Sequence, residues 1–368
     1  MTVLRTSPRN APASSSASAP LTAGRLAKWA PWALLAASLA TSAIVFALGT
    51  LGGDLADFNI AGAVFVGVLL YMLLITVVSS IAESRRKAID RLMTALVSAA
   101  FTVALLPLIS LLWTVVANGV ARFDAEFFSY SMRNVVGDGG GIVHAIWGTV
   151  LVTLMATVIA VPVGLMTSIY LVEYGRGRLA AGITFFVDVM TGIPSIVAGL
   201  FIYSVFALLV RPGISMGFMG ALALAVLMVP VVVRGSEELL RIVPNELREA
   251  AYALGVPKWL TVLKVVLPTS IAGITTSVML AIARVIGETA PLLLTAGFTA
   301  SLNTNLFSGQ MMTLPVFAYN SYMNQGTAAD ASVARAWAAA LTLILIVMLL
   351  NLFARLIARW FAPKTAGR

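Results

Sequence analysis

Long apolar runs, separated by short polar segments, fill most of this chain of 368 residues. A helix needs about 20 residues to cross the hydrocarbon core of a bilayer, and eight of the runs reach that length. They lie at residues 30–51, 60–82, 92–117, 143–172, 182–210, 214–234, 268–298 and 334–361. The pattern therefore predicts an all-α fold, a polytopic bundle of transmembrane helices.

The pattern changes in segment 245–268, which lies between two of these runs. Its first half is apolar on one helical face only, through Leu247, Ala250, Ala251 and Leu254. Asn245 can cap this helix, Gly255 can end it, and Pro257 fits the first turn of the next helix. The second half keeps an apolar stripe as far as Pro268. We predict two short amphipathic helices joined by a bend, an element that could rest on lipid headgroups or on a partner protein.

Composition supports a membrane protein. Apolar residues make up 60% of the chain and charged residues 11%, whereas soluble domains are about a quarter charged. The mean hydropathy is +0.97. The chain has no cysteine, which excludes disulfides, thiolate catalysis and metals bound by cysteine. Its only histidine, His144, borders an apolar run and is assigned no function.

The 24 Lys and Arg residues report the topology. Nineteen lie in every second polar segment between the apolar runs, a set that includes both chain ends and the region of 245–268. One more, Arg284, lies within an apolar run. The other set holds only Arg122, Arg133, Arg211 and Arg335. Because cytoplasmic loops carry the excess of Lys and Arg, we predict that both termini and segment 245–268 are cytoplasmic. The basic residues do not gather on one face, so the net charge of +9 does not indicate nucleic-acid binding.

Segment 245–268 also carries a spaced motif. It reads E-A-A, three residues, Gly, nine residues, then Val265-x-Leu-Pro. The motif resembles the EAA loop of permease subunits of ATP-binding-cassette importers, with Val265 in place of the usual Ile. The resemblance implies a cytoplasmic coupling helix that docks on a separate ATPase subunit. The residues that would form it are Glu249, Ala250, Ala251, Gly255 and Pro268.

The resemblance covers roughly residues 88–365 and implies a core of six transmembrane helices within 83–368, with a coupling loop at 235–266. Residues 30–82 fall outside it. They are predicted to form an accessory pair of transmembrane helices, either packed against lipid or with a regulatory or partner-binding role. Residues 1–29 are predicted to be a disordered, basic cytoplasmic tail. A cleaved signal peptide is disfavoured, because the segment before the first apolar run is too long for one.

Two charges in the run after the motif are the main candidates for a substrate path. Arg284 and Glu288 are four residues apart and would share one helical face. They could form a mutual salt bridge, or they could line an anion pathway, because charges at membrane depth are costly and often functional. Arg offers a fork of donors that suits oxyanions. Glu288 could accept a hydrogen bond from hydrogen phosphate, which carries a proton, but not from sulfate.

Two segments resemble the PstA-type phosphate-transport permeases. One is Arg284-x-x-GETAPLLLTAG, and the other is Asp188-VMTGIPSI. The resemblance implies a substrate path that includes Arg284, Glu288, Thr289 and Asp188. Asp188 could instead be a surface carboxylate near Arg176 or Arg178. In that second segment, Gly192 and Pro194 would bend or unwind the helix.

The chain lacks the groups that would let it hydrolyse ATP or bind a metal. No G-x-x-x-x-G-K-[ST] motif and no cluster of metal ligands occurs in it. The resemblance therefore implies no cofactor in this chain, with ATP and magnesium bound by a partner ATPase dimer of PstB type. It also implies a second permease of PstC type, a phosphate-binding protein of PstS type outside the membrane, and a prokaryotic inner or plasma membrane. A homodimer of this chain is the alternative pairing.

Three functional alternatives remain open. The chain could be a permease for another oxyanion, sulfate or molybdate. It could be the partner phosphate permease of PstC type. It could also be an ion-coupled secondary transporter or a channel, although the sequence shows none of the internal repeats typical of that class. A membrane permease subunit of an ATP-driven phosphate importer, which is not itself an enzyme, best accounts for both the EAA-like motif and the segment that begins at Arg284.

Overall fold

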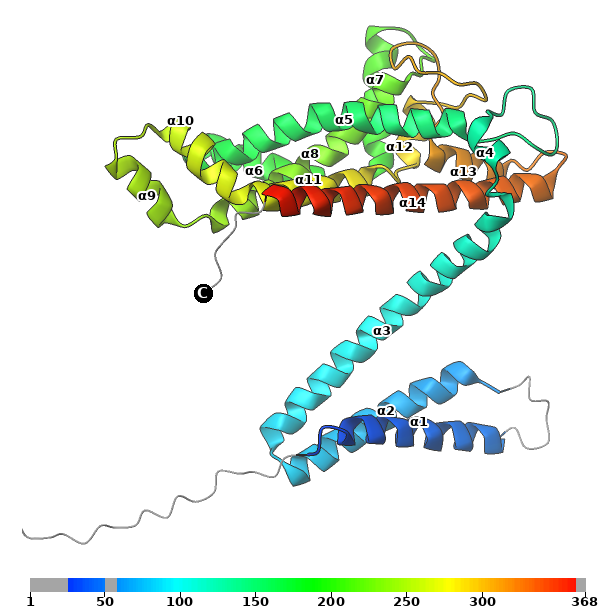
Figure 1. Ribbon diagram of the computed structural model, residues 1–368, viewed down its shortest axis with the longest axis vertical. Coiled ribbons are helices and arrows are strands. Elements are labelled where there is room, and N and C mark those ends of the chain that lie inside the picture. The colour runs from blue at the N-terminus through cyan, green and yellow to red at the C-terminus, as the bar shows by residue number, and fades with distance from the viewer. Residues whose placement is uncertain (1–25, 50–57, 362–368) are drawn as a thin grey trace, which may run out of the picture. The chain divides into compact units, whose positions relative to one another are not determined.

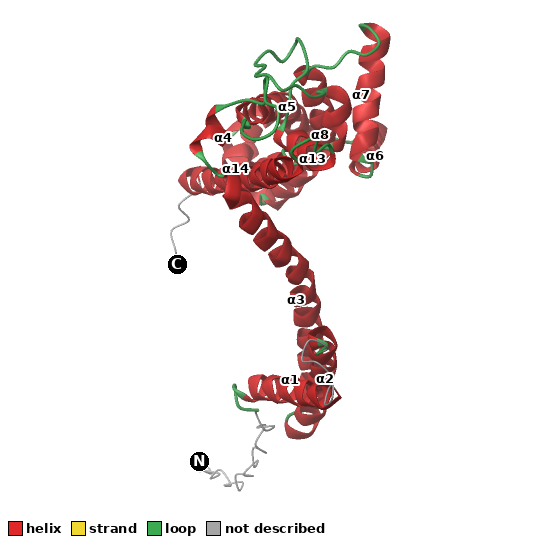
Figure 2. Cartoon of the chain, turned by 90° about the vertical axis from the view of Figure 1, so that its right-hand side faces the viewer, coloured by secondary structure: helices red, strands yellow, loops and turns green. Residues whose placement is uncertain are grey.

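The computed structural model describes residues 26–49 and 58–361, so the predicted tail at 1–29 lies almost wholly outside the described residues. Within the described ranges the chain forms helices and loops and no strand (Figure 1, Figure 2). The predicted all-α fold is confirmed. The chain divides into two compact units, Met1–Leu111 and Leu112–Arg368. The division at residues 82 and 83, drawn from the resemblance, stays a prediction.

The first unit contains α1 (Ala30–Gly49), α2 (Ile60–Ala82) and most of α3 (Arg85–Gly119). The α1 and α2 helices pack against each other through small and polar residues. The Ser42 hydroxyl donates a hydrogen bond of 2.6 Å to the Ala63 carbonyl of α2. Helices that approach through small residues are typical of membrane proteins, where there is no difference in hydrophobicity between lipid and helix to drive association.

Glu83 joins the start of α3 to this helix pair. Its side chain is only 2% exposed and accepts hydrogen bonds from the Leu26 backbone N–H and the Ser79 hydroxyl. It also pairs with Arg91 at 3.0 Å and with Lys87 at 3.7 Å. A buried carboxylate is tolerated when its oxygens are satisfied in this way. The bend between α2 and α3 is therefore fixed by charge and hydrogen bonds rather than by apolar packing.

The second unit begins with the end of α3 and contains the other helices. Its first half consists of η2 (Val120–Arg122), α4 (Ala125–Ser129), α5 (Val143–Ile169), the π-helical turn η3 (Tyr170–Tyr174), α6 (Gly177–Thr191), α7 (Ser195–Leu209) and α8 (Gly217–Ile242). Its second half consists of α9 (Asn245–Ala253), α10 (Lys258–Thr261), the π-helical turn η4 (Val262–Val266), α11 (Leu267–Val285), α12 (Ala290–Thr295), α13 (Leu314–Met323) and α14 (Ala329–Phe361).

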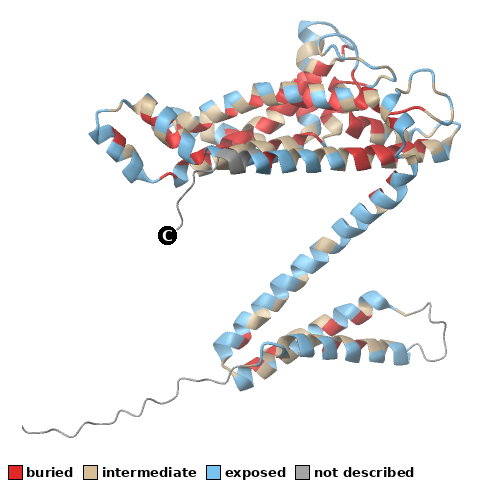
Figure 3. Ribbon diagram, in the orientation of Figure 1, coloured by how far each residue is buried: buried red, intermediate tan, exposed pale blue. Residues whose placement is uncertain are grey.

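Helix α8 is at the centre of this unit. It packs against α5, α6, α7, α11 and α12, and buried residues line it along most of its length (Figure 3). The core that it forms with α5 contains Val152, Ala156, Leu224, Met228 and Val232. The same core also contains Ala145, Ala160, Ala221 and Ala225, and these small side chains let the helix axes come close together. At Gly164 of α5, an added Cβ would lie 2.7 Å from a methyl group of Val232.

We expect Gly148→Ala to destabilise the second unit by about 1–3 kcal/mol or more, as overpacking does. A Cβ at this position of α5 would lie 1.8 Å from the backbone oxygen of Met312, which has little freedom to move. The neighbouring Thr149 hydroxyl accepts a hydrogen bond from the Leu314 N–H at 2.8 Å. This hydrogen bond holds the backbone around Met312 close to α5. Thermal unfolding of the purified protein measures the effect.

The matched control is Gly182→Ala in α6, where an added Cβ meets nothing within 4 Å. Because Ala is favoured over Gly in a helix by about 0.5–1 kcal/mol, this variant should unfold at or slightly above the wild-type temperature. Equal unfolding temperatures for Gly148→Ala and Gly182→Ala would contradict the predicted clash.

The predicted number of membrane spans agrees with the structure. Seven described helical segments are long and apolar enough to span a bilayer, and the bent pair α6 and α7 makes an eighth. The run 182–210, for which a bent or unwound helix was predicted, forms two helices, α6 and α7, that meet at an angle of 108°. The predicted break at Gly192 and Pro194 is confirmed: α6 ends at Thr191, and Pro194 precedes α7. Since Pro disfavours helical conformation in the residue before it, the break has a local cause.

A second predicted helix is also shorter than expected. The run 268–298 forms α11 only as far as Val285, and the separate short helix α12 follows. The backbone then turns at Gly297, which has a φ of +73°. Apolar periodicity alone does not reveal the end of α11, because Val285 and Ile286 on its two sides are both apolar and buried.

Candidate functional site

The break between α6 and α7 borders a cavity of about 170 Å³. Thr191, Ile193 and Ser195 line it from the break, and Pro230 and Val231 line it from the middle of α8. The end of α11 completes it with Arg284, Val285 and Glu288. The cavity thus joins three elements that are far apart in the sequence, and it contains both charges that the sequence singled out.

The structure changes how Arg284 and Glu288 are related. Arg284 is in the last turn of α11, but the helix ends at Val285, so the prediction that the pair shares one helical face is wrong. Glu288 lies in the following turn, where its backbone N–H donates a hydrogen bond of 3.1 Å to the Val285 carbonyl. The two side chains nevertheless line one cavity.

Arg284 and Glu288 do not form the mutual salt bridge that the spacing allowed. The ion pairs among the described residues include neither side chain. Arg284 is exposed in this single chain, and Glu288 is half-buried. The guanidinium is therefore available to an anion. Thr289, the third candidate, is the N-cap residue of α12 and is not among the residues that line the cavity.

Asp188 lies outside the cavity and has a different partner from the one that the sequence indicated. Its carboxylate pairs with Arg234 of α8 and not with Arg176 or Arg178. Arg234 also pairs with Glu237 at 3.0 Å, and Glu237 pairs with Arg241 at 2.7 Å. The four alternating charges connect α6 to the C-terminal half of α8. Sequence reasoning missed Arg234 as a partner because it is 46 positions away.

The helices of the coupling motif form as predicted, with a bend between them. Helix α9 ends before Gly255, which has a φ of +77°, and Pro257 is the N-cap residue of α10. The second helix does not end at Pro268, however, because the helical segment Lys258–Val285 is continuous. Pro268 lies in the first turn of α11, where its missing N–H costs nothing.

The exposed surface of these helices includes several large apolar side chains. Of the motif residues, Glu249, Ala250, Gly255 and Pro268 are exposed and only Ala251 is buried. Leu254 is 83% exposed and Trp259 is 59% exposed. An amphipathic helix pair that leaves its large apolar side chains uncovered has a surface suited to a protein partner or a lipid surface.

Arg248 holds this helix pair to the membrane helices. Its guanidinium pairs with Glu173 of η3 at 2.9 Å and donates to the carbonyls of Leu240 and Val243 at 2.9 and 2.6 Å. It also bonds the Asn245 side chain, so Asn245 does not cap α9 as predicted. The Glu173 side chain is 4% exposed. Sequence reasoning used Arg248 only in the charge count, because no local signal links it to a residue 75 positions away.

Comparisons with known proteins agree with this arrangement. A family model described as "Binding-protein-dependent transport system inner membrane component" matches residues 160–367. The phosphate transport system permease protein PstA 1 of Mycobacterium tuberculosis (strain CDC 1551 / Oshkosh) is 46% identical over 277 residues, 74% of this chain and 90% of that protein. The PstA permease of Yersinia pestis is 39% identical over 293 residues, 78% of this chain and 96% of that protein.

A solved structure shares the fold. A chain of a bacterial alginate ABC transporter, in complex with a periplasmic protein bound to an alginate pentasaccharide, has a TM-score of 0.53 and 12% identity. The match covers 74% of this chain and 96% of that chain. At this identity the likeness supports the fold alone, whereas the sequence matches cover most of both proteins. The chain is therefore a multi-pass inner-membrane protein that belongs to the family of binding-protein-dependent transport system inner membrane components, and within it to the PstA-type permeases.

Proposed function

We propose that this chain is a membrane permease subunit of an ATP-driven phosphate importer. Relatives named phosphate transport permeases, 46% and 39% identical over most of the chain, support phosphate as the substrate. The observation that carries the proposal is Arg284, which lines the cavity at the break between α6 and α7 without an ion-pair partner among the described residues. A guanidinium with free donors binds oxyanions through short, charge-assisted hydrogen bonds.

Glu288 gives this path its preference among oxyanions. Its carboxylate lines the same cavity as Arg284 and would repel an anion that carries no proton. Hydrogen phosphate has a hydroxyl that can donate to it, and sulfate has none at neutral pH. The other two candidates act indirectly: Thr289 sets the start of α12 beside the cavity, and Asp188 holds α6 to α8 through Arg234.

The apolar face of α9 and α10 is the docking surface for an ATPase subunit. Glu249, Ala250 and Gly255 are exposed there, and the resemblance to the EAA loop supports the assignment. ATP and magnesium would bind to that subunit, which is of PstB type and would form a dimer. A PstC-type permease and a PstS-type binding protein would complete the importer. The excess of Lys and Arg supports a cytoplasmic position for both termini and for this surface.

Uptake of radiolabelled phosphate by the reconstituted complex tests the proposal, with sulfate and molybdate as competitors. We expect phosphate to be transported and neither competitor to displace it at equal concentration. Glu288→Gln should let sulfate compete, because an amide removes the repulsion and can donate as well as accept. Transport of sulfate or molybdate instead of phosphate by the wild type would favour the alternative, a permease for another oxyanion.

A further inference from the structure

A second cavity, of about 310 Å³, lies at the opposite end of the second unit from the coupling helices. The cavity and the coupling helices lie at opposite ends of α5. His144 in the first turn of α5 lines the cavity, and Glu173, which pairs with Arg248 of α9, follows its last turn. The helical segment Val143–Tyr174 has 32 residues, which corresponds to about 48 Å at 1.5 Å per residue. The cavity is therefore on the outer side if the coupling helices are cytoplasmic.

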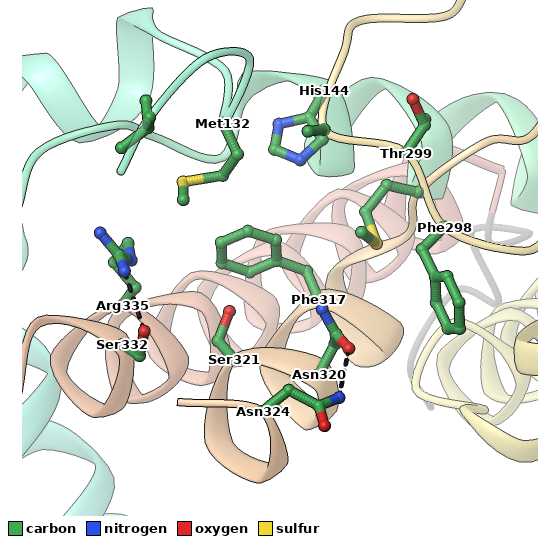
Figure 4. Close-up of a pocket in the computed structure, with 13 residues that line it drawn as sticks. Met132, His144, Phe298, Thr299, Phe317, Asn320, Ser321, Asn324, Ser332 and Arg335 are labelled. Carbon is green, nitrogen blue, oxygen red and sulfur yellow. Dashed lines mark hydrogen bonds between the residues drawn. The ribbon is translucent and has the colours of Figure 1, made fainter. Parts of the chain in front are cut away.

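Arg335 of α14 supplies a positive charge to this cavity (Figure 4). It is 5% exposed. Its guanidinium donates to the carbonyls of Gly137 and Gly139 at 2.8 and 3.0 Å and to the Ser332 hydroxyl at 2.9 Å. These partners are neutral, and no carboxylate pairs with Arg335 among the described residues. The Nε–H donor is not used in these bonds. Burial of a guanidinium without a paired carboxylate costs free energy. An anion bound in the cavity would offset that cost.

His144 faces the same cavity with both ring nitrogens unused. It is 1% exposed, and neither Nδ1 nor Nε2 has a hydrogen-bond partner in the described structure. The ring of Phe317 packs edge-on against it, with 5.5 Å between the ring centroids. A buried imidazole normally finds a partner for at least one nitrogen. His144 is also in the first turn of a long helix, whose positive end favours an anion.

Neutral polar side chains line one part of the cavity, beside apolar side chains such as Met132 and Phe298. Asn320, Ser321 and Asn324 line it from α13 and the residue after that helix (Figure 4). The Asn324 amide donates to Asn320 Oδ1 at 2.7 Å, which leaves the Asn320 amide N–H donors for other partners. Asp138 is near enough to attract the charge of Arg335 but forms no ion pair with it, and Asp124 and Glu126 are both held by Arg122. No acidic side chain lines the cavity itself.

We propose that this outer cavity binds an oxyanion of the phosphate class. Arg335 supplies the charge, and His144 in the first turn of α5 and the Asn320 amide of α13 supply hydrogen bonds. A water molecule takes about 30 Å³ in the liquid, so the cavity holds a small tetrahedral anion with part of its hydration shell. The anion is either free phosphate on its way to Arg284 or the phosphate group of a lipid. Only the first of these rests on the proposed function.

The test uses the absence of cysteine from the chain. Ser321→Cys places the chain's only thiol in the cavity, and Thr304→Cys places one on the exposed outer loop, away from the cavity residues. The complex is incorporated in nanodiscs of zwitterionic lipid, and an anionic methanethiosulfonate reagent is added. The mass of this chain then reports the rate of modification. We expect inorganic phosphate to slow modification of Ser321→Cys severalfold compared with chloride at equal ionic strength, and to leave Thr304→Cys unaffected.

Two further variants guard against a folding effect. Arg335→Gln should abolish the protection; because Arg335 also holds a loop, Asn320→Ala is tested beside it and should weaken protection while the protein stays assembled. If phosphate protects in zwitterionic lipid, the ligand is the free anion. If protection appears only with phosphatidylglycerol in the nanodisc, the ligand is the lipid phosphate. If neither protects Ser321→Cys, the proposed site is overturned. Phosphate uptake with no protection would overturn this site alone and leave the proposed function standing.

Discussion

Phosphate uptake by the reconstituted importer should fall roughly ten- to a hundredfold when Arg284 is replaced by Gln. Arg284 lines the cavity beside the broken span and has no carboxylate partner among the described residues. A hydrogen bond to a charged group contributes about 1.5–3 kcal/mol, and about 1.4 kcal/mol corresponds to a factor of ten. Gln keeps a neutral donor but loses the charge and the fork.

The measurement pairs radiolabelled uptake with the rate of ATP hydrolysis by the same complex. Loss of uptake with normal assembly and hydrolysis would place Arg284 in the substrate path. Arg284→Lys separates charge from geometry, because Lys is a point charge and not a planar fork. Full transport by the Lys variant would argue against two-point binding of the oxyanion, and full transport by the Gln variant would make the residue structural.

Arg248→Ala should uncouple ATP hydrolysis from transport and destabilise the coupling segment. Removal of one partner from a buried ion pair costs about 3–5 kcal/mol, and here it would leave the Glu173 carboxylate, 4% exposed, unpaired. The carbonyls of Leu240 and Val243 would lose their partner at the same time. Hydrolysis should therefore continue with little or no phosphate uptake, while thermal unfolding of the complex shifts to lower temperature.

Arg178→Ala is the matched control, since Arg178 is exposed and pairs with no carboxylate among the described residues. It should change neither stability nor coupling. The double variant Glu173→Leu, Arg248→Met removes both charges and should recover stability, because a neutral pair leaves no buried charge unpaired. If that double variant also recovers coupled uptake, the ion pair itself is not needed for coupling. If Arg248→Ala transports like the wild type, the proposed link is wrong.

Features with a local cause were predictable from the sequence. The eight apolar runs, the bend at Gly255 and the break before Pro194 follow from composition and backbone preference, and the structure agrees with each. The end of α11 at Val285 was not predicted. Gly287, Glu288, Thr289 and Pro291 follow it closely, but the run 268–298 is otherwise apolar and its periodicity predicts one helix. The i, i+4 spacing of Arg284 and Glu288 therefore suggested a shared helical face that the backbone does not provide.

Contacts between distant segments could not be predicted from the sequence. Arg234, Arg248 and Arg335 had entered only as topological charges, yet each holds two or more segments together. Arg335 lies 196 and 198 positions from the glycine carbonyls that it bonds. Tertiary packing alone brings such residues together, so a charge count gives the side of the membrane but not the partner.

The break at residues 192–194 also predicts where this protein holds water within the membrane. When a helix stops inside a membrane span, its last carbonyl groups and the first N–H groups of the next helix lose their intrahelical partners. Hydrocarbon cannot satisfy them, so such backbone persists only within protein or beside a water-filled cavity. Thr191, Ile193 and Ser195 line the cavity that contains Arg284. We therefore expect water in this cavity to solvate the broken backbone and the guanidinium together, which would lower the cost of keeping that charge in the membrane before any substrate arrives.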